Sequence, residues 1–381
     1  MSEKIRVSTP SRLCLFGEHQ DYLGLEVIAV AINLRFRAAI ERRNDSIIHI
    51  RIRDSRLNRL DATNKEQLYQ IIEVDLKKPI KYRSNRDYLL SCINLLQREG
   101  YPLTGFDIQL DSEIPIGKGM CSSSTMVVVL IKALLEGIQH PDRLDPRLIA
   151  ELGFRAEVLE FHEPGGKMDH YTSALGGMVH IDFGESFQIE PLASQLSGCF
   201  ILIDSLQQKN TTKVLAESKI PTQEALEQLE PYGITSVRDF FAGEQKIDEQ
   251  LRLLRHLDAF HQRKLMANIE NYAILMEGRS LLNQPEPDSQ AFGQLLNRHH
   301  VQLRDGLGIS TPLIESLLDA AQKQGAWGGK INGSGGGGCC FVYADHKDAD
   351  RIISTIQQKG YPARKLEQDS GVRREDHATS K

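Results

Sequence analysis

A glycine-rich segment with the sequence PIGKGMCSSST, residues 115–125, combines the residue types that bind phosphate. Its glycines allow backbone amides to approach an anion closely, and free N–H groups at the start of the helix expected to follow attract negative charge. The residues assigned to this site are Gly117, Gly119, Ser122, Ser123 and Ser124. A glycine turn with serine N-caps and no ligand has the same composition. Because Lys118 precedes Gly119, the segment is not a GxxxxGK[ST] P-loop.

A second polar cluster lies near the N-terminus in TPSRLCLFGEHQDYLG, residues 9–24. It gathers one base, two acids and an imidazole around a glycine: Arg12, Glu18, His19 and Asp21. A solvated loop is the ordinary explanation for such a cluster. His19 by itself is a weak candidate for a catalytic base, because no Ser or Cys partner stands at a meaningful spacing.

A third cluster, RAEVLEFHEPGGKMDHYTSALGG, residues 155–177, supplies carboxylates. They are Glu157, Glu160, Glu163 and Asp169. For the first two, a solvated helical face is the ordinary explanation.

A fourth segment, GGKINGSGGGGCC, residues 328–340, is either a flexible linker or a backbone that approaches another surface closely. Residues typical of strands flank it on both sides, which argues against a linker.

These four segments, in this order, resemble the motifs of the GHMP kinase superfamily, and of galactokinases in particular. The first is similar to the phosphate loop PLGGGLSSSAS, with Cys121 where a serine is usual. The second resembles the signature PGRVNLIGEHTDYNGG and departs from it at Leu25. The third is similar to the stretch built on PCGIMDQ, and the fourth resembles the motif that braces the phosphate loop. The resemblance runs from about Val7 to Tyr343, but residues 205–290 match poorly.

The resemblance implies a role for each matching residue. Asp169 would receive or orient the proton of the acceptor hydroxyl, and Arg12 would face both the transferred phosphoryl group and this catalytic carboxylate. Sugar contacts would come from Glu18, His19, Asp21 and the backbone of Gly166. The phosphate loop would cradle ATP, and Mg²⁺ would be held by Ser123 (or Ser122) and Glu157. Hard oxygen ligands of this kind suit Mg²⁺.

The implied activity is ATP-dependent phosphorylation of a sugar, at the anomeric hydroxyl, giving a sugar 1-phosphate and ADP. After FILID, residues 200–204, galactokinases usually carry an EYxxRR-like string, whereas this chain reads SLQQKNTTKVLAESK and has no tyrosine there. We therefore expect the acceptor to be a small sugar, but not necessarily galactose.

Three alternatives stay open. A GHMP kinase for a non-sugar alcohol such as mevalonate or homoserine is disfavoured by GEHxDY, because those kinases usually lack the His and Asp that grip a sugar. A non-catalytic galactokinase-like sugar sensor is disfavoured by retention of Arg12, Asp169 and the phosphate loop. A dinucleotide-dependent oxidoreductase is the most distant, since no GxGxxG is followed by a ribose-binding acid.

The elements that would position these motifs follow from periodicity and turn residues. Residues 222–300 are expected to be mainly helical, with breaks at Pro231, Gly243 and residues 283–288. Ser310, Thr311 and Pro312 would begin a helix that stops at Gly325. We expect further strands within 25–52 and at 106–115, 178–183 and 200–204, and further helices at 87–98, 126–134 and 146–161.

The length of 381 residues favours two domains. The family resemblance implies an α+β fold in two domains, with ATP and substrate in the cleft between them. We expect residues 1–195 to carry the phosphate loop and catalytic residues, and residues 196–365 to carry the glycine-rich third motif of the family. Residues 366–381 form a charged tail without periodicity, which we expect to be loose.

Composition narrows the partners and the compartment. A formal net charge of -5 and the absence of a long basic run argue against nucleic acid or an anionic membrane surface as the partner. No apolar segment resembles a signal peptide, and the longest apolar run, residues 126–135, is too short to span a bilayer. Six cysteines without CxxC spacing favour reduced thiols in the cytoplasm. The sequence does not indicate an oligomeric state.

Overall fold

The computed structural model describes residues 3–53, 69–193, 195–208, 211–242 and 250–375. Within these residues an eight-stranded sheet has the order β12-β1-β2-β5-β3-β4, with β6 paired to β2 and β7 to β6. β3 and β5 pair in parallel, and the remaining pairs are antiparallel. Its strands are β1 (Ile5–Phe16), β2 (Glu26–Arg42), β3 (Ile47–Arg53), β4 (Tyr69–Asp75), β5 (Phe106–Ser112), β6 (Met178–Asp182), β7 (Gln188–Pro191) and β12 (Arg373–Arg374).

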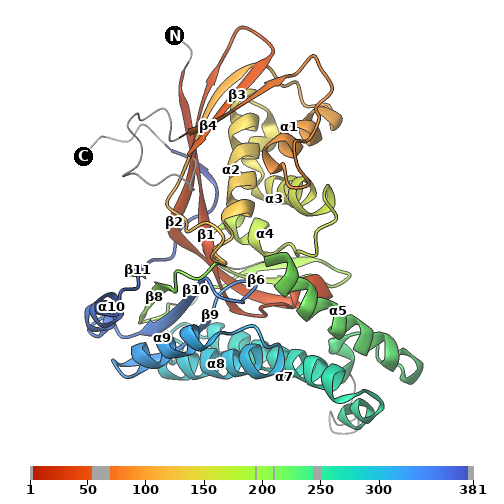
Figure 1. Cartoon of the computed structure of the whole chain (residues 1–381), viewed down its shortest axis with the longest axis vertical. Coiled ribbons are helices and arrows are strands. Elements are labelled where there is room, and N and C mark those ends of the chain that lie inside the picture. The colour runs from red at the N-terminus through yellow and green to blue at the C-terminus, as the bar shows by residue number, and fades with distance from the viewer. Residues whose placement is uncertain (1–2, 54–68, 194, 209–210, 243–249, 376–381) are drawn as a thin grey trace.

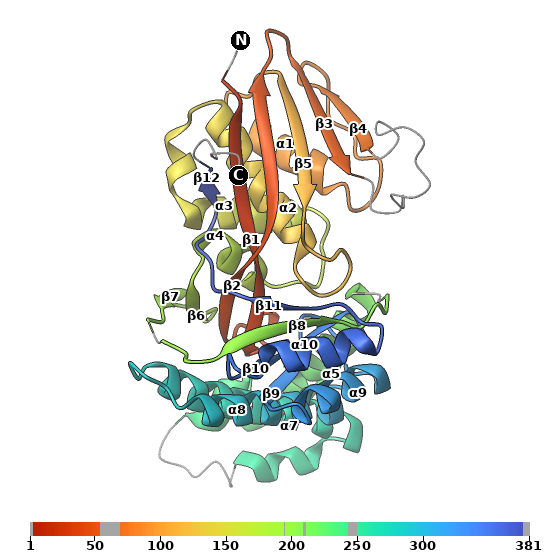
Figure 2. The same ribbon diagram turned by 90° about the vertical axis from the view of Figure 1, so that its left-hand side faces the viewer.

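Helices cover one face of this sheet (Figures 1 and 2). They are α1 (Tyr88–Arg98), α2 (Ser122–Gly137), α3 (Pro146–Phe154) and α4 (Met168–Leu175). α2 forms despite three consecutive valines, because residues 127–135 are all buried against the sheet and its neighbours. β5 shows the expected alternation, with Phe106, Ile108 and Leu110 buried and the residues between them exposed.

A second sheet of four strands has the order β11-β8-β10-β9. Its strands are β8 (Cys199–Asp204), β9 (Ala326–Ile331), β10 (Cys339–Ala344) and β11 (Ala363–Leu366). The helices around it are α5 (Thr211–Leu229), α7 (Ala259–Leu282), α8 (Ser289–Val301), α9 (Pro312–Gln322) and α10 (Ala349–Gln358). Figure 1 shows α7, α8 and α9 beneath this sheet, at the opposite end from β3 and β4. The chain therefore has a mixed α/β fold in two domains, and the expected boundary near residue 195 falls between β7 and β8.

Most of the expected elements are present, with differences at their ends. The expected helix at 146–161 is an α-helix only to Phe154, and residues 155–159 continue it as a π-helical turn. α5 starts at Thr211, earlier than expected, and contains Pro221. The breaks at Pro231 and at residues 283–288 are present, whereas the expected break at Gly243 lies outside the described residues. Thr311 is the N-cap of α9.

The expectation of a loose tail after Lys365 is wrong for residues 366–375. Leu366 closes β11, and the chain then returns to the larger sheet, where Arg373 and Arg374 pair with β1 (Figure 2). The guanidinium of Arg35 is buried and donates to the Asp369 carboxylate at 2.7 Å and to the carbonyls of Ser370 and Gly371. Charge without periodicity suggested disorder, but here a buried cation in another part of the chain binds the segment.

The described part of the chain contains no helix that is both long and apolar enough to cross a membrane. Each of the six cysteines is buried and free, so none forms a disulfide.

Candidate functional site

The phosphate loop connects β5 to α2 and has the backbone that an anion site needs. Gly117 and Gly119 have φ of +68° and +81°, which glycine adopts at little cost. Cys121 also has a positive φ, +47°, and α2 begins at the next residue, Ser122. The first free amides of α2, a sixteen-residue helix, therefore belong to the serines. The loop can bind phosphate at this helix start.

The glycine-rich segment between β9 and β10 packs directly on the phosphate loop. Cys339 donates its N–H to the Lys118 carbonyl at 2.8 Å, and Asn332 Nδ2 donates to the Gly119 carbonyl at 2.9 Å. A Cβ on Gly333 would stand 2.5 Å from the Gly119 carbonyl oxygen. Close backbone approach, as opposed to linker flexibility, thus explains the glycines, and the second domain supports the phosphate loop.

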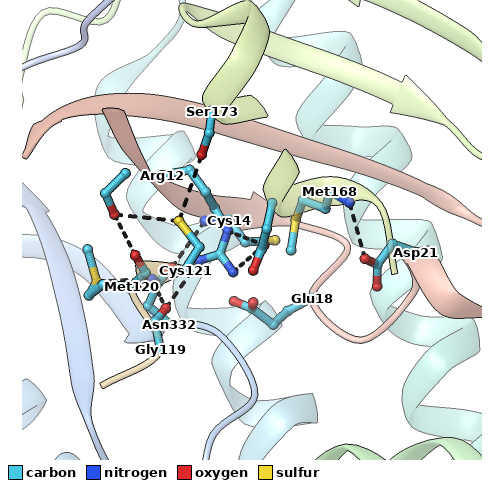
Figure 3. Close-up of polar contacts among 12 residues, drawn as sticks. Arg12, Cys14, Glu18, Asp21, Gly119, Met120, Cys121, Met168, Ser173 and Asn332 are labelled. Carbon is cyan, nitrogen blue, oxygen red and sulfur yellow. Dashed lines mark hydrogen bonds and ion pairs between the residues drawn. The ribbon is translucent and has the colours of Figure 1, made fainter. Parts of the chain in front are cut away.

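Arg12, which Figure 3 shows beside Gly119 and Cys121 of this loop, is in contact with Asp169. Arg12 lies on β1 and Asp169 in the first turn of α4, and Arg12 Nε and Nη2 stand 2.7 and 2.6 Å from Asp169 Oδ1. Nη1 of Arg12 donates to the Gly119 carbonyl at 3.3 Å, so one buried guanidinium joins the anion site to the carboxylate. Burial acts to lower the pKa of Arg12, but several nearby groups, Asp169 first among them, together outweigh burial and raise this pKa above its ordinary value.

Asp21 stands close to Asp169 and Gly166. Its Oδ2 accepts the Met168 N–H at 3.4 Å, and a Cβ on Gly166 would stand 1.9 Å from that same oxygen. Burial and the neighbouring Asp169 charge raise the pKa of Asp21 to about 6. The site therefore contains two carboxyl groups in different environments, one paired with Arg12 and one without a cation of its own in the described contacts.

His19 links the N-terminal cluster to the glycine-rich segment of the second domain. Its Nε2 lies 3.1 Å from the Ser334 carbonyl oxygen, which can only accept, so Nε2 carries the proton. In the neutral ring, Nδ1 then accepts from the Tyr22 hydroxyl at 2.7 Å. Both ring nitrogens are engaged, and the backbone of His19 is left-handed, with φ of +66°.

Glu18 is almost completely buried and pairs with a residue that the sequence had not singled out. Lys330 Nζ, on β9, lies 2.5 Å from Glu18 Oε2, and both side chains are at most 2% exposed. The only signal in the sequence was one lysine inside a stretch of glycine and apolar residues.

Glu157 lies in the π-helical turn, buried under the start of α2. His170 Nε2 donates to its Oε2 at 2.7 Å, and the hydroxyls of Ser123 and Ser124 also hydrogen-bond to it. Burial acts to raise the pKa of Glu157, but these hydrogen bonds outweigh it and hold the pKa below its ordinary value. His170 was also missed, although it follows Asp169 directly.

The other two acids of this cluster are engaged at the surface. Glu160 binds Tyr82 and Arg98, and Glu163 binds Tyr88 and Arg86. Glu157 alone of the three shares a site with the phosphate-loop serines.

A serine hydroxyl and an ionised carboxylate fit Mg²⁺, which prefers hard oxygen ligands. Among the described residues no group of three or more His, Cys, Asp or Glu side chains could hold a metal ion. The donors at Ser123 and Glu157 thus suit an ion that takes its remaining ligands from phosphate and water, as Mg²⁺ commonly does.

Three family models match this chain. The GHMP kinases N terminal domain matches residues 87–177, the GHMP kinases C terminal model matches residues 280–362, and the galactokinase galactose-binding signature matches residues 2–42. The three matches together span more than half of the chain. They include every segment that forms the site described above.

Relatives from two groups cover nearly the whole chain. A mevalonate kinase from Thermococcus sibiricus is 27% identical over 98% of this chain and 99% of its own length. A galactokinase from Streptomyces coelicolor is 26% identical over 92% of this chain and 87% of its own. Among solved structures, Lactococcus lactis galactokinase complexed with galactose superimposes with a TM-score of 0.81 at 21% identity, covering 97% of this chain and 95% of that one.

Proposed function

The chain belongs to the GHMP kinase superfamily, whose members are ATP-dependent kinases, and on that premise we propose that it phosphorylates a sugar at the anomeric hydroxyl. The products would be a sugar 1-phosphate and ADP. The observation that carries the proposal is the contact of Asp169 with Arg12 beside the phosphate loop, with Asp21 of the matched galactose-binding signature adjacent to both.

Phosphoryl transfer requires alignment of a hydroxyl with the γ-phosphate and stabilisation of the charge that shifts. The amides at residues 117–124 would hold the phosphates of ATP. Arg12 would stabilise charge on the transferred group, because it is buried, fixed by Asp169 and already in contact with the phosphate loop. Mg²⁺ held by Ser123 and Glu157 would neutralise charge on the phosphate oxygens.

Asp169 would accept or orient the proton of the acceptor hydroxyl. Its contact with Arg12 fixes the carboxylate in place, which suits it to orient the acceptor hydroxyl. Because the transition state is loose, a weak base suffices. Glu18, His19, Asp21 and the backbone of Gly166 would contact other hydroxyls of the acceptor.

The identity of the sugar is a separate part of the proposal. α5 packs against residues 21–23 and brings Lys219 Nζ to 5.6 Å from the centre of the Tyr22 ring. The described part of α5 has no tyrosine facing the site. A buried polar group that lacks its partner costs about 1–3 kcal/mol, so we propose that a related pyranose, uronic acid or heptose is a better acceptor than galactose.

A second candidate is phosphorylation of mevalonate. The observation that favours it is the near-complete coverage of both chains in the match to the T. sibiricus mevalonate kinase. The match of residues 2–42 to the galactose-binding signature supports the sugar instead.

One assay separates the candidates: ADP release with ATP and Mg²⁺ over a panel of galactose, other pyranoses, uronic acids, heptoses and mevalonate. The Asp169→Asn variant is the control for background hydrolysis. We expect turnover with at least one sugar and none with its 1-deoxy analogue. Turnover with mevalonate alone would replace the sugar proposal, and sugar binding without ADP release would support the non-catalytic sensor. The cytoplasmic location stays a prediction.

A further inference from the structure

Side chains of the second domain bind the backbone of β1 where it leaves its regular pairing. The register between β1 and β2 shifts between Cys14 and Phe16. There, Asn332 Oδ1 accepts the Cys14 N–H at 3.1 Å, and Lys330 Nζ donates to the Cys14 carbonyl at 2.9 Å. His299 Nδ1 donates to the Leu15 carbonyl at 3.2 Å. At this register shift, side chains of the second domain therefore supply hydrogen-bond partners for backbone groups of β1.

Lys330 does more than satisfy a carbonyl, because its second contact is the Glu18 carboxylate at 2.5 Å. The two residues are 312 positions apart and lie on different domains. A carboxylate as buried as Glu18 is tolerated only with a partner, and among the described residues Lys330 forms an ion pair with it. Lys330 is itself 0% exposed, so neither charge can turn to water instead.

Glu18 stands in the same site as Arg12 and Asp21 (Figure 3), in the segment that matches the galactose-binding signature. Because Lys330 binds Oε2 of Glu18, the other carboxylate oxygen is the one that can accept a hydrogen bond from a ligand hydroxyl. The direction of that oxygen depends on the geometry of the pair, and therefore on the seating of β9 against β1.

We propose that Lys330 is a positioning residue for the phosphoryl acceptor: from the second domain it holds the Glu18 carboxylate in place, so that the acceptor pocket is complete only while β9 is docked on β1. This inference rests on the proposed function, because it assumes that Glu18 contacts the acceptor. It predicts that acceptor recognition, and not ATP recognition, depends on Lys330.

The test compares Lys330→Met, Glu18→Gln and the double variant in the full chain. The matched control is Lys264→Met, which also removes a buried lysine of the second domain. Its Nζ donates to the Leu307 carbonyl at 2.6 Å, and it forms no ion pair with a described residue. Each protein is measured for melting temperature, for ADP affinity by calorimetry, and for the KM values of ATP and of whichever acceptor the wild type uses.

We expect Lys330→Met to lower the melting temperature by roughly 5–10 °C, because it leaves the Glu18 charge buried and unpaired. The double variant should recover much of that loss, yet its acceptor KM should stay raised by about tenfold or more. ADP affinity and the KM of ATP should change by less than about threefold. Lys264→Met should lower stability without changing the acceptor KM.

Two results would overturn the inference. One is a double variant whose loss of stability equals the sum of the two single losses, which would show that the residues are not coupled. The other is a Lys330→Met protein whose acceptor KM equals that of the wild type or of Lys264→Met. Neither result depends on the acceptor being a sugar. Turnover of mevalonate alone would remove the sugar proposal, but the acceptor KM values could still be compared with mevalonate. The comparison of stability losses in the single and double variants needs no acceptor.

Discussion

Gly166 and Asp21 are in such close contact that a methyl group on Gly166 would stand 1.9 Å from Asp21 Oδ2. Gly166→Ala should therefore displace Asp21 and raise the acceptor KM by about tenfold or more, because small misplacements of a binding group are costly. The KM of ATP should remain near that of the wild type. Gly165→Ala is the control, since a Cβ there would meet only Val158 Cγ2 at 3.4 Å. Equal effects of the two substitutions would contradict the assigned contact.

Asp169→Asn tests the catalytic carboxylate. The amide keeps an oxygen for Arg12 but can no longer take up the hydroxyl proton, so we expect kcat to fall by about 10²–10⁴-fold. Affinity for ATP, measured by calorimetry, should survive because the phosphate loop is unchanged. Near-normal turnover would remove Asp169 from the mechanism.

Glu157→Ala tests the magnesium assignment against two neighbouring acids. We expect the Mg²⁺ concentration needed for half-maximal nucleotide binding to rise by about tenfold or more, with acceptor affinity little changed. Glu160→Ala and Glu163→Ala are matched controls, because their carboxylates bind Arg98 and Arg86. If either control reproduces the magnesium phenotype, the metal ligand has been assigned to the wrong acid.

Acceptor binding should depend on pH through Asp21. Its pKa is raised from 3.8 to about 6, and its ionised form is the better hydroxyl acceptor. The kcat/KM for the acceptor should therefore fall as pH decreases through about 6. Asp21→Asn should lower kcat/KM at neutral pH and remove this inflection. A wild-type profile that is flat between pH 5 and 7 would argue against an ionised Asp21 in binding.

The raised pKa of Asp21 also predicts that the stability of the fold depends on pH, in the direction opposite to that of acceptor binding. A carboxyl group whose pKa is raised on folding binds its proton more tightly in the folded state, so its contribution to stability is full below the ordinary pKa and is lost as pH rises through about 6. The stability of Asp21→Asn relative to the wild type should therefore increase as the pH is raised from about 4 to about 8. After allowance for partial exposure, we expect a gain of about 1 kcal/mol in the free energy of unfolding.

Arg35→Met tests the C-terminal segment that the sequence suggested to be loose. The substitution leaves the Asp369 carboxylate and the carbonyls of Ser8, Ser370 and Gly371 without their buried donor, and should lower the free energy of unfolding by about 3 kcal/mol. Arg37→Met, on the same strand, removes an exposed pair with Glu113 and should cost less than about 1 kcal/mol. Comparable losses in chemical denaturation would show that residues 369–371 add little to the fold.

Local pattern was enough to predict much of this molecule. The alternation in β5, the glycines and serines at the start of α2, and the N-cap at Thr311 all depend on residues within a few positions of one another. Four motifs in family order also indicated the two-domain fold. The roles carried over to single residues remain predictions that the experiments above address.

Long-range contacts could not be predicted in this way. The tail illustrates the difficulty, because nothing near residues 366–375 indicates that Arg35 would bind them. The pairing of Glu18 with Lys330 illustrates it again, since Lys330 stands among glycines that suggested only close backbone packing.

The sequence by itself determined the order of the motifs, the helix that follows the phosphate loop and the chemical types available to the site. The family resemblance had already implied that Arg12 lies beside Asp169 and that Glu157 lies with Ser123. Only the tertiary structure decided that Lys330 reaches Glu18 and that His170 binds Glu157. Periodicity reports which face of an element is buried, but it does not report what that face meets. For buried charges the partner is set by sheet register and domain docking, and both depend on residues hundreds of positions apart.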